Sequence, residues 1–267
     1  MIRTFQIVGP VFLTFGSATM AKQRIPLSGA TSAESAGSLV FSREQIRALD
    51  AAAVAELGIP GLLLMENAAR GVADVLMARF GMADAGHAAR LPPVVIVCGP
   101  GNNGGDGLAL CRLLAAWQME SRVLLLTADK RLSADAASNR AFLQRCQISV
   151  QEPVVEMMVD QLVGLSADSL IVDCLLGTGV QGAPRAPFSD VIAAMNDSAA
   201  TVVSVDVPSG LDCETGTAVG ACVRAAVTVS FVGLKTGYVS ASAACLGDVE
   251  IVPIGLPWSW VTAFHAR

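Results

Sequence analysis

The chain has 267 residues, of which 53% are hydrophobic and 15% are charged. A chain of this length can bury a large core without disulfide or metal staples, and its apolar composition suits an α/β domain with an interior sheet. The formal net charge is −5 and no long run of Lys or Arg occurs. This balance argues against nucleic acid as the main partner, because phosphate-backbone binding depends on clustered positive charge.

Residues 1–40 differ in composition from the rest of the chain. The apolar stretch at residues 7–18 is too short to span a bilayer, so we expect no membrane association. A signal peptide, a transit peptide and an upstream extension with Met20 as the true start are all compatible with this segment. Residues 28–38 are rich in Ser, Ala and Gly and indicate a linker. We expect residues 1–40 to be weakly ordered and dispensable, and residues 41–267 to form one domain.

The first predicted elements are two helices. Ser42 and Gln45 have the spacing of a capping box, and the apolar periodicity that follows predicts a helix as far as Gly58. Pro60 suits the first turn of a second helix, which should end at Gly81. Residues 83–93 are expected to be a connector.

Short apolar runs and helical patterns then alternate along the chain. The expected strands are residues 94–98, 123–126, 170–174, 202–205, 226–231 and 249–252, and the expected helices are residues 106–117, 134–146, 154–165 and 188–196. Strands without polar alternation that are separated by helices indicate a sheet covered on both faces. The sequence therefore predicts a three-layer α/β/α, Rossmann-like fold with a mostly parallel central sheet.

A glycine-rich segment follows the first of these strands. Residues 99–104 match G-x-G-x-x-G between a strand and a helix, and Asp129 lies where a ribose-binding acid is expected. Such a turn lets backbone N–H groups approach a phosphate, although a plain tight turn would have the same pattern. A dehydrogenase is disfavoured, because His87 and His265 are poorly placed for catalysis and Tyr238 follows Lys235 instead of preceding a lysine.

The complete segment of residues 99–107, Gly-Pro-Gly-Asn-Asn-Gly-Gly-Asp-Gly, resembles the signature of the NAD(P)H-hydrate epimerases, the family that shares the YjeF N-terminal domain. Further similar segments contain Asn67, Asp173 with Gly177 and Gly179, Asp206 with Ser209 and Gly210, and Lys235. The family more often has Pro at the position of Thr236. The resemblance runs from about residue 42 to residue 257, which leaves residues 1–40 and 258–267 outside it.

The resemblance implies a set of site residues. The substrate-binding residues would be Asn67, Asn102, Asn103, Gly104, Gly105, Asp106, Gly177, Thr178, Gly179, Val180, Gln181, Gly182, Ala183 and Asp206. One K⁺ per subunit would be bound by Asn103, Asp173 and Ser209, whose oxygen atoms suit a hard cation.

Asp206 is the expected catalytic residue, because it ends an apolar strand just before a Val-Pro-Ser-Gly turn. A capping role in that turn is the structural alternative. Lys235 would orient the Asp206 carboxylate or bind phosphate, and an ordinary surface lysine is equally compatible with the sequence.

The resemblance also implies the activity. Family members interconvert the S and R forms of hydrated NADH and NADPH (NADHX and NADPHX), and a separate ADP- or ATP-dependent dehydratase then restores the cofactor. An iminium ion and a ring-opened aldehyde are both compatible intermediates. The seven scattered cysteines form no Cys-x-x-Cys pair, which indicates a reducing, cytoplasmic location, and we expect a homodimer. A non-catalytic scaffold on the same fold is the main alternative function.

Overall fold

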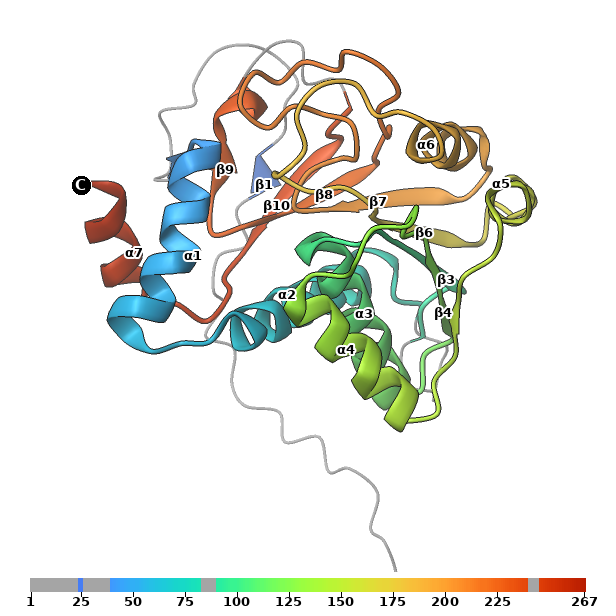
Figure 1. Ribbon diagram of the computed structural model, residues 1–267, viewed down its shortest axis with the longest axis horizontal. Coiled ribbons are helices and arrows are strands. Elements are labelled where there is room, and N and C mark those ends of the chain that lie inside the picture. Colours follow the sequence, from blue (N-terminus) through green and yellow to red (C-terminus); the bar gives the residue numbers. More distant parts are fainter. Residues whose placement is uncertain (1–23, 26–38, 83–89, 240–244) are drawn as a thin grey trace, which may run out of the picture.

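The computed structural model describes residues 24–25, 39–82, 90–239 and 245–267, and these build a central sheet between two layers of helices (Figure 1). The sheet has eight strands in the order β1-β10-β8-β7-β6-β3-β4-β5. Its strands are β1 (Arg24–Ile25), β3 (Val94–Cys98), β4 (Ser121–Leu125), β5 (Val150–Gln151), β6 (Leu170–Cys174), β7 (Thr201–Val205), β8 (Val227–Phe231) and β10 (Asp248–Val252). Every neighbouring pair is parallel except β1 with β10. The expected mostly parallel, Rossmann-like fold is thus confirmed.

Helices cover both faces of this sheet. The helices α2 (Gly61–Phe80), α3 (Asn102–Ala116) and α4 (Ala134–Arg145) cover one face, and α5 (Val155–Val163) and α6 (Phe188–Asp197) cover the other (Figure 1). Strand β3 is apolar throughout because both of its faces are buried. Val94, Ile96 and Cys98 pack into the first hydrophobic layer, while Val95 and Val97 pack into the second.

A smaller group of elements stands beside the sheet. It comprises β2 (Val40–Phe41), α1 (Arg43–Leu57), β9 (Leu234–Lys235), the 3₁₀ helix η1 (Thr236–Val239) and α7 (Trp258–His265). Phe41, Leu49 and Val261 share one buried cluster, and His265 Nε2 lies 2.8 Å from the carbonyl oxygen of Val40. These contacts hold α1 in place. The sequence pattern did not predict α7, which is only eight residues long.

Most predicted boundaries differ from the structure by one or two residues. The capping box is confirmed, because Gln45 N donates to Ser42 Oγ at 3.1 Å and Ser42 N donates to Gln45 Oε1 at 2.9 Å. Pro60 is the extended residue before α2, so its predicted place in the first turn was wrong. Helix α3 begins at Asn102, four residues earlier than predicted. The prediction missed this first turn because it consists of Asn and Gly residues, which have a low helix propensity.

The structure describes only parts of residues 1–40 and of the connector, so the predictions for these segments can be compared with it only in part. Residues 1–23, 26–38 and 83–89 lie outside the described residues, and His87 is among them. Within the first segment, the described pair Arg24–Ile25 forms β1. The weak order and dispensability of residues 1–40 therefore stay predictions. Across the described ranges, no helix is long and apolar enough to cross a membrane.

The order of the strands determines where a ligand can enter. After β3 the chain continues to β4 and β5 on one side, whereas β6, β7, β8 and β10 lie on the other side. The connections that leave the carboxyl ends of β3 and β6 therefore run to opposite faces of the sheet. Open α/β sheets bind ligands in the crevice at such a switch point.

Candidate functional site

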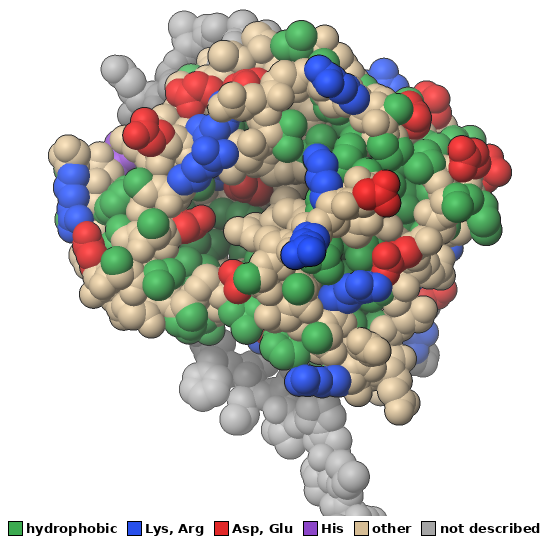
Figure 2. All heavy atoms as spheres, viewed as in Figure 1, with side chains coloured by type: hydrophobic (Ala, Val, Ile, Leu, Met, Phe, Trp, Pro, Cys, Tyr) green, Lys and Arg blue, Asp and Glu red, His purple; other side chains and the backbone are tan. Residues whose placement is uncertain are grey.

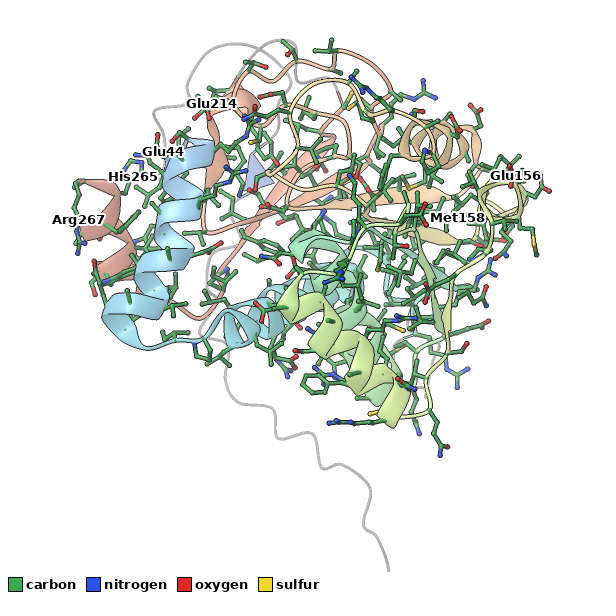
Figure 3. All side chains as sticks on the ribbon, in the orientation of Figure 1. Glu44, Glu156, Met158, Glu214, His265 and Arg267 are labelled. Atoms are coloured by element: carbon green, nitrogen blue, oxygen red, sulfur yellow. The ribbon has the colours of Figure 1, made fainter. Side chains whose placement is uncertain are left out.

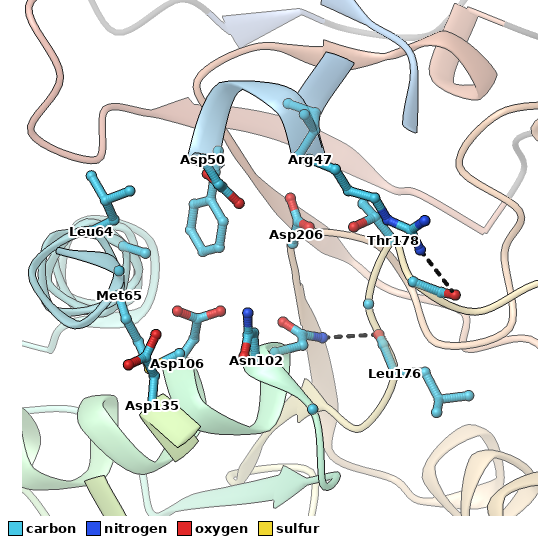
Figure 4. Close-up of a pocket in the computed structure, with 18 of the residues that line it drawn as sticks. Arg47, Asp50, Leu64, Met65, Asn102, Asp106, Asp135, Leu176, Thr178 and Asp206 are labelled. Atoms are coloured by element: carbon cyan, nitrogen blue, oxygen red, sulfur yellow. Dashed lines mark hydrogen bonds between the residues drawn. The ribbon is translucent and has the colours of Figure 1, made fainter. Parts of the chain in front are cut away.

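A pocket of about 610 Å³ opens at the carboxyl edge of the sheet, between α1, α2 and the segments that follow β3, β6 and β7. This volume lies in the range of small-molecule and cofactor sites. Its ionisable and amide side chains are those of Arg47, Asp50, Asn102, Asn103, Asp106, Lys130, Asp135 and Asp206 (Figure 4). The space-filling view shows this face hollowed, with acidic side chains at the hollow and basic side chains beside it (Figure 2).

The glycines after β3 bring two segments of backbone into close contact. A Cβ atom on Gly99 would lie 1.9 Å from the carbonyl oxygen of Leu175, and one on Gly104 would lie 1.9 Å from that of Gly99. A Cβ atom on Gly105 would collide with Met65 on α2. Gly104 and Gly105 therefore serve close packing and are not among the lining residues, whereas Asn102, Asn103 and Asp106 of the same helical turn line the pocket.

Lys235 forms an ion pair with Asp206, which lines the pocket. The Lys235 side chain is 1% exposed, and its Nζ lies 2.8 Å from Asp206 Oδ1. The same ammonium donates to Ser230 Oγ at 3.2 Å and to the carbonyl oxygen of Phe231 at 3.1 Å. All three of its protons therefore have acceptors, and the ammonium contacts the Asp206 carboxylate directly. The surface-lysine interpretation was wrong.

The backbone of Asp206 has an unusual conformation. Its φ is 62°, in the left-handed region that non-glycine residues rarely adopt. The amide of Asp206 donates to the carbonyl oxygen of Val229 at 2.8 Å, and the buried Tyr238 hydroxyl donates to the carbonyl oxygen of Asp206. These contacts hold the strained residue in place, which is typical of functional positions.

Two of the three further carboxyl groups that line the pocket have a raised pKa. Desolvation and the nearby Asp206 raise the pKa of Asp50 to about 6, although Lys235 opposes this rise. Burial, followed by the charges of Asp206 and Asp50, raises the pKa of Asp106 well above its usual value. Asp50 remains accessible to solvent on its helix, while pocket residues surround its carboxyl (Figure 4). The site therefore combines one ion-paired carboxylate with two carboxyls that take up protons readily.

Helix α1 is attached to the loops of the site by Arg43. Its Nη2 lies 2.9 Å from Asp212 Oδ2, and its Nε donates to the carbonyl oxygen of Thr178 at 2.9 Å. The amide of Arg43 donates to Glu214 Oε2 at 2.8 Å, at the beginning of α1 (Figure 3). The capping box and these contacts together direct one face of α1 toward the pocket.

A cluster of oxygen atoms lies beside the pocket, under the turn after β6. Asp173 is fully buried and accepts from Ser204 Oγ at 2.9 Å and from Ser209 Oγ at 2.6 Å. Ser209 Oγ and Asn103 Nδ2 both lie near the carbonyl oxygen of Leu176, at 3.3 and 2.9 Å.

Two features of this cluster fit a monovalent cation. Asn103 Oδ1 is buried without a hydrogen-bond partner, and Asp173 has no ion pair within the described part of the chain. Burial raises the pKa of Asp173 even though four hydrogen bonds oppose that rise. An unpartnered carbonyl oxygen and a buried carboxylate are the donor types that a hard cation binds.

The remaining predicted substrate-binding residues fall into two groups. Gly177, Thr178, Gly179 and Val180 line the pocket. Gln181, Gly182, Ala183 and Asn67 are not among its lining residues; the first three are exposed, and Asn67 Nδ2 donates to the carbonyl oxygen of Leu63 at 3.0 Å.

Sequence reasoning missed four charged lining residues, which are Arg47, Asp50, Lys130 and Asp135. Asp50 directly follows the buried Leu49 on α1, so it borders the apolar face of that helix. This position could have indicated from the sequence that Asp50 lies near the interior of the protein. Arg47 and Lys130 follow no recognised motif, and only the folded chain brings them to the pocket.

The fold and this site define an α/β protein with a pocket of cofactor size at the switch point of its sheet, where open α/β sheets bind their ligands. The family model described as "YjeF-related protein N-terminus" matches residues 61–237. The chain belongs to this family.

Relatives of known name agree with that assignment. The chain is 40% identical over 223 residues to the NAD(P)H-hydrate epimerase of Pirellula staleyi, a match that covers 82% of this chain and 93% of that protein. It is 34% identical to the bifunctional NAD(P)H-hydrate repair enzyme Nnr of Salinibacter ruber, over 82% of this chain and 41% of that protein. The crystal structure of the yeast protein YNL200c has the same fold, with a TM-score of 0.65 and 24% identity over 75% of this chain and 83% of that one.

Proposed function

We propose that this protein is an NAD(P)H-hydrate epimerase, which interconverts the S and R forms of hydrated NADH and NADPH at carbon 6 of the nicotinamide ring. Relatives that match over most of the chain bear this name. The observation that carries the proposal is the ion pair between the buried Lys235 and Asp206, which lines a pocket of cofactor size. A non-catalytic scaffold would have no use for a strained, ion-paired carboxylate at that place.

Asp206 is proposed as the catalytic residue. The ring nitrogen lone pair assists departure of the carbon 6 hydroxyl, and water adds back on the opposite face while Asp206 takes up its proton. Lys235 keeps the Asp206 carboxylate pointed at the substrate, because its ammonium is buried and contacts the carboxylate directly.

The substrate would be bound mainly by the segments after β3 and β6. Asn102, Asn103 and Asp106 stand on one side, and the turn from Gly177 to Val180 stands on the other. The phosphates of the substrate require a positive charge nearby. Lys235 does not supply it, because its ammonium is buried and paired with Asp206. Arg47 and Lys130 are the cationic side chains among the lining residues, and neither has an ion pair in the described part of the chain. We assign the phosphates to them.

Asn103, Asp173 and Ser209 are proposed to hold one K⁺ together with backbone carbonyls. When bound, the ion would offset the buried charge of Asp173 and hold the turns after β3, β6 and β7 together. The buried, unpartnered Asn103 Oδ1 is the observation that supports this assignment.

The functional partner would be an NAD(P)H-hydrate dehydratase that consumes the S form. Several relatives are bifunctional repair enzymes, of which this chain spans only 37–41%. A homodimer and a cytoplasmic location are part of the same proposal.

The test is an epimerisation assay with purified R-hydrate as substrate and the dehydratase as coupling enzyme, with the uncatalysed rate subtracted. The wild-type protein should accelerate formation of the dehydratase substrate. Asp206→Asn should retain the fold but lose about a hundredfold or more in rate, as expected when a general acid/base is removed. A wild-type protein without activity on both hydrates would overturn the proposal.

A further inference from the structure

Epimerisation at carbon 6 poses a geometrical problem for a site with one catalytic carboxylate. Oxygen must leave from one face of the ring and arrive at the other, so proton transfer is needed on both faces. Asp206 is fixed by Lys235 and by its constrained backbone, and therefore serves one face. A second proton-transfer group must reach the other face. This inference rests on the epimerase function proposed above.

Asp50 has the placement that such a group requires. It extends from α1, whereas Asp206 projects from the carboxyl edge of the sheet, so the two carboxyls come from different walls of one pocket (Figure 4). Among the described residues, the Asp50 side chain makes neither a hydrogen bond nor an ion pair, so it has no structural partner that would explain its presence. We infer that Asp50 is the second proton-transfer group and acts on the face of carbon 6 that Asp206 does not serve.

The charges around Asp50 suit this role. Its carboxyl faces charged groups on three other elements, which are the Asp206–Lys235 pair at the sheet edge, Asp106 on α3 and Asp135 on α4. Arg47 lies one turn earlier on the same helix as Asp50. Desolvation and the negative charge of Asp206 place the pKa of Asp50 at about 6. A group with this pKa both gives and accepts protons near neutrality, which is what acid–base catalysis demands.

Asp106 is less suitable, although it also lines the pocket. Its pKa lies well above the usual value because it is buried among other carboxyls. Its side chain is also more deeply buried than that of Asp50, so it exchanges a proton with solvent less readily. Asp50, which is accessible to solvent, can exchange its proton between turnovers.

The two carboxyls complete a balanced reaction. Protonated Asp50 gives its proton to the carbon 6 hydroxyl, the C–O bond breaks, and the ring nitrogen lone pair forms a C=N bond as water leaves. A second water then adds to the opposite face, the C=N electron pair returns to nitrogen, and Asp206 takes the water proton. The enzyme now has Asp50 ionised and Asp206 protonated, which is the form that catalyses the reverse direction.

The test compares Asp50→Asn with Glu44→Gln, which removes the same charge from the same helix but lies outside the pocket (Figure 3). Epimerisation rates are measured between pH 5 and 9, and binding of NADP⁺ is measured by calorimetry. Asp50→Asn should lose about a hundredfold in kcat with NADP⁺ affinity within about threefold of wild type. Its residual rate should lack the pH dependence near pH 6 that wild type and Glu44→Gln show.

Each other outcome has a definite meaning. An Asp50→Asn variant with near-normal kcat and an unchanged pH profile overturns the role of Asp50. A parallel loss of NADP⁺ binding and rate makes Asp50 a binding residue and also overturns it. If Asp50→Asn does not fold, Asp50→Ser and the wild-type pH profile decide: without a group titrating near pH 6, the inference fails. An inactive wild type, in contrast, refutes the epimerase function itself.

Discussion

The buried ion pair of Lys235 and Asp206 allows a quantitative prediction. Lys235→Met keeps the length and apolar stem of the side chain but removes the ammonium, which leaves the Asp206 carboxylate without a counter-charge. The acceptors at Ser230 and Phe231 also lose their donor. Breaking a buried ion pair by removing one partner costs about 3–5 kcal/mol. Because the Asp206 side chain is 13% exposed, we expect the lower end, about 3 kcal/mol of unfolding free energy.

Urea unfolding of a mutant cycle measures this effect. Lys235→Met should also lower Tm by roughly 6–12 °C, at about 2–4 °C per kcal/mol for a domain of this size. The double variant Lys235→Met/Asp206→Asn should recover about 2 kcal/mol relative to the sum of the single variants, because no unpaired charge remains. Lys130→Met, at an exposed lysine, is the matched control and should change stability by less than about 0.5 kcal/mol. A Lys235→Met variant as stable as this control, or additive single effects, would refute the reasoning.

Three other predictions concern the ion, the phosphates and Asp50. Exchanging K⁺ for choline at constant ionic strength should lower the Tm of wild type by several degrees, because a ligand at about 100 times its Kd contributes about 2.7 kcal/mol of stability. The same exchange should lower the Tm of Ser209→Ala by less. An equal Tm of wild type in both salts would contradict the site. Lys130→Gln should weaken NADP⁺ binding by about fivefold in calorimetry at low salt, and a similar loss in the neighbouring Arg131→Gln would count against a specific contact. The pKa of Asp50 is raised to about 6, so the stability that this group contributes at low pH is lost as the pH rises through 6. Asp50→Asn should therefore be more stable than wild type at pH 8, by about 1 kcal/mol after allowance for solvent, and the gain should vanish near pH 4 in thermal melts.

The sequence alone determined the layers of this protein and the position of its main site. The unbroken apolar run at β3 and the capping box at Ser42 are encoded by neighbouring residues, so their patterns identify a buried strand and the start of a helix. Asn103, Asp206 and Ser209 follow strands, Asp173 lies near the carboxyl end of β6, and parallel strands end at one edge of the sheet. Their meeting at that edge follows from local pattern and topology together.

Tertiary structure decided which side chains share the pocket and in what state. The Lys235 ammonium contacts Asp206, Ser230 and Phe231, and it does so only after β7, β8 and β9 have assembled. Asp50 reaches the site because Arg43 and α7 attach α1 to distant parts of the chain. Its pKa depends on desolvation and on Asp206, which is far from it in sequence. Burial and Coulomb interactions act through space, so a linear pattern of residues does not record them.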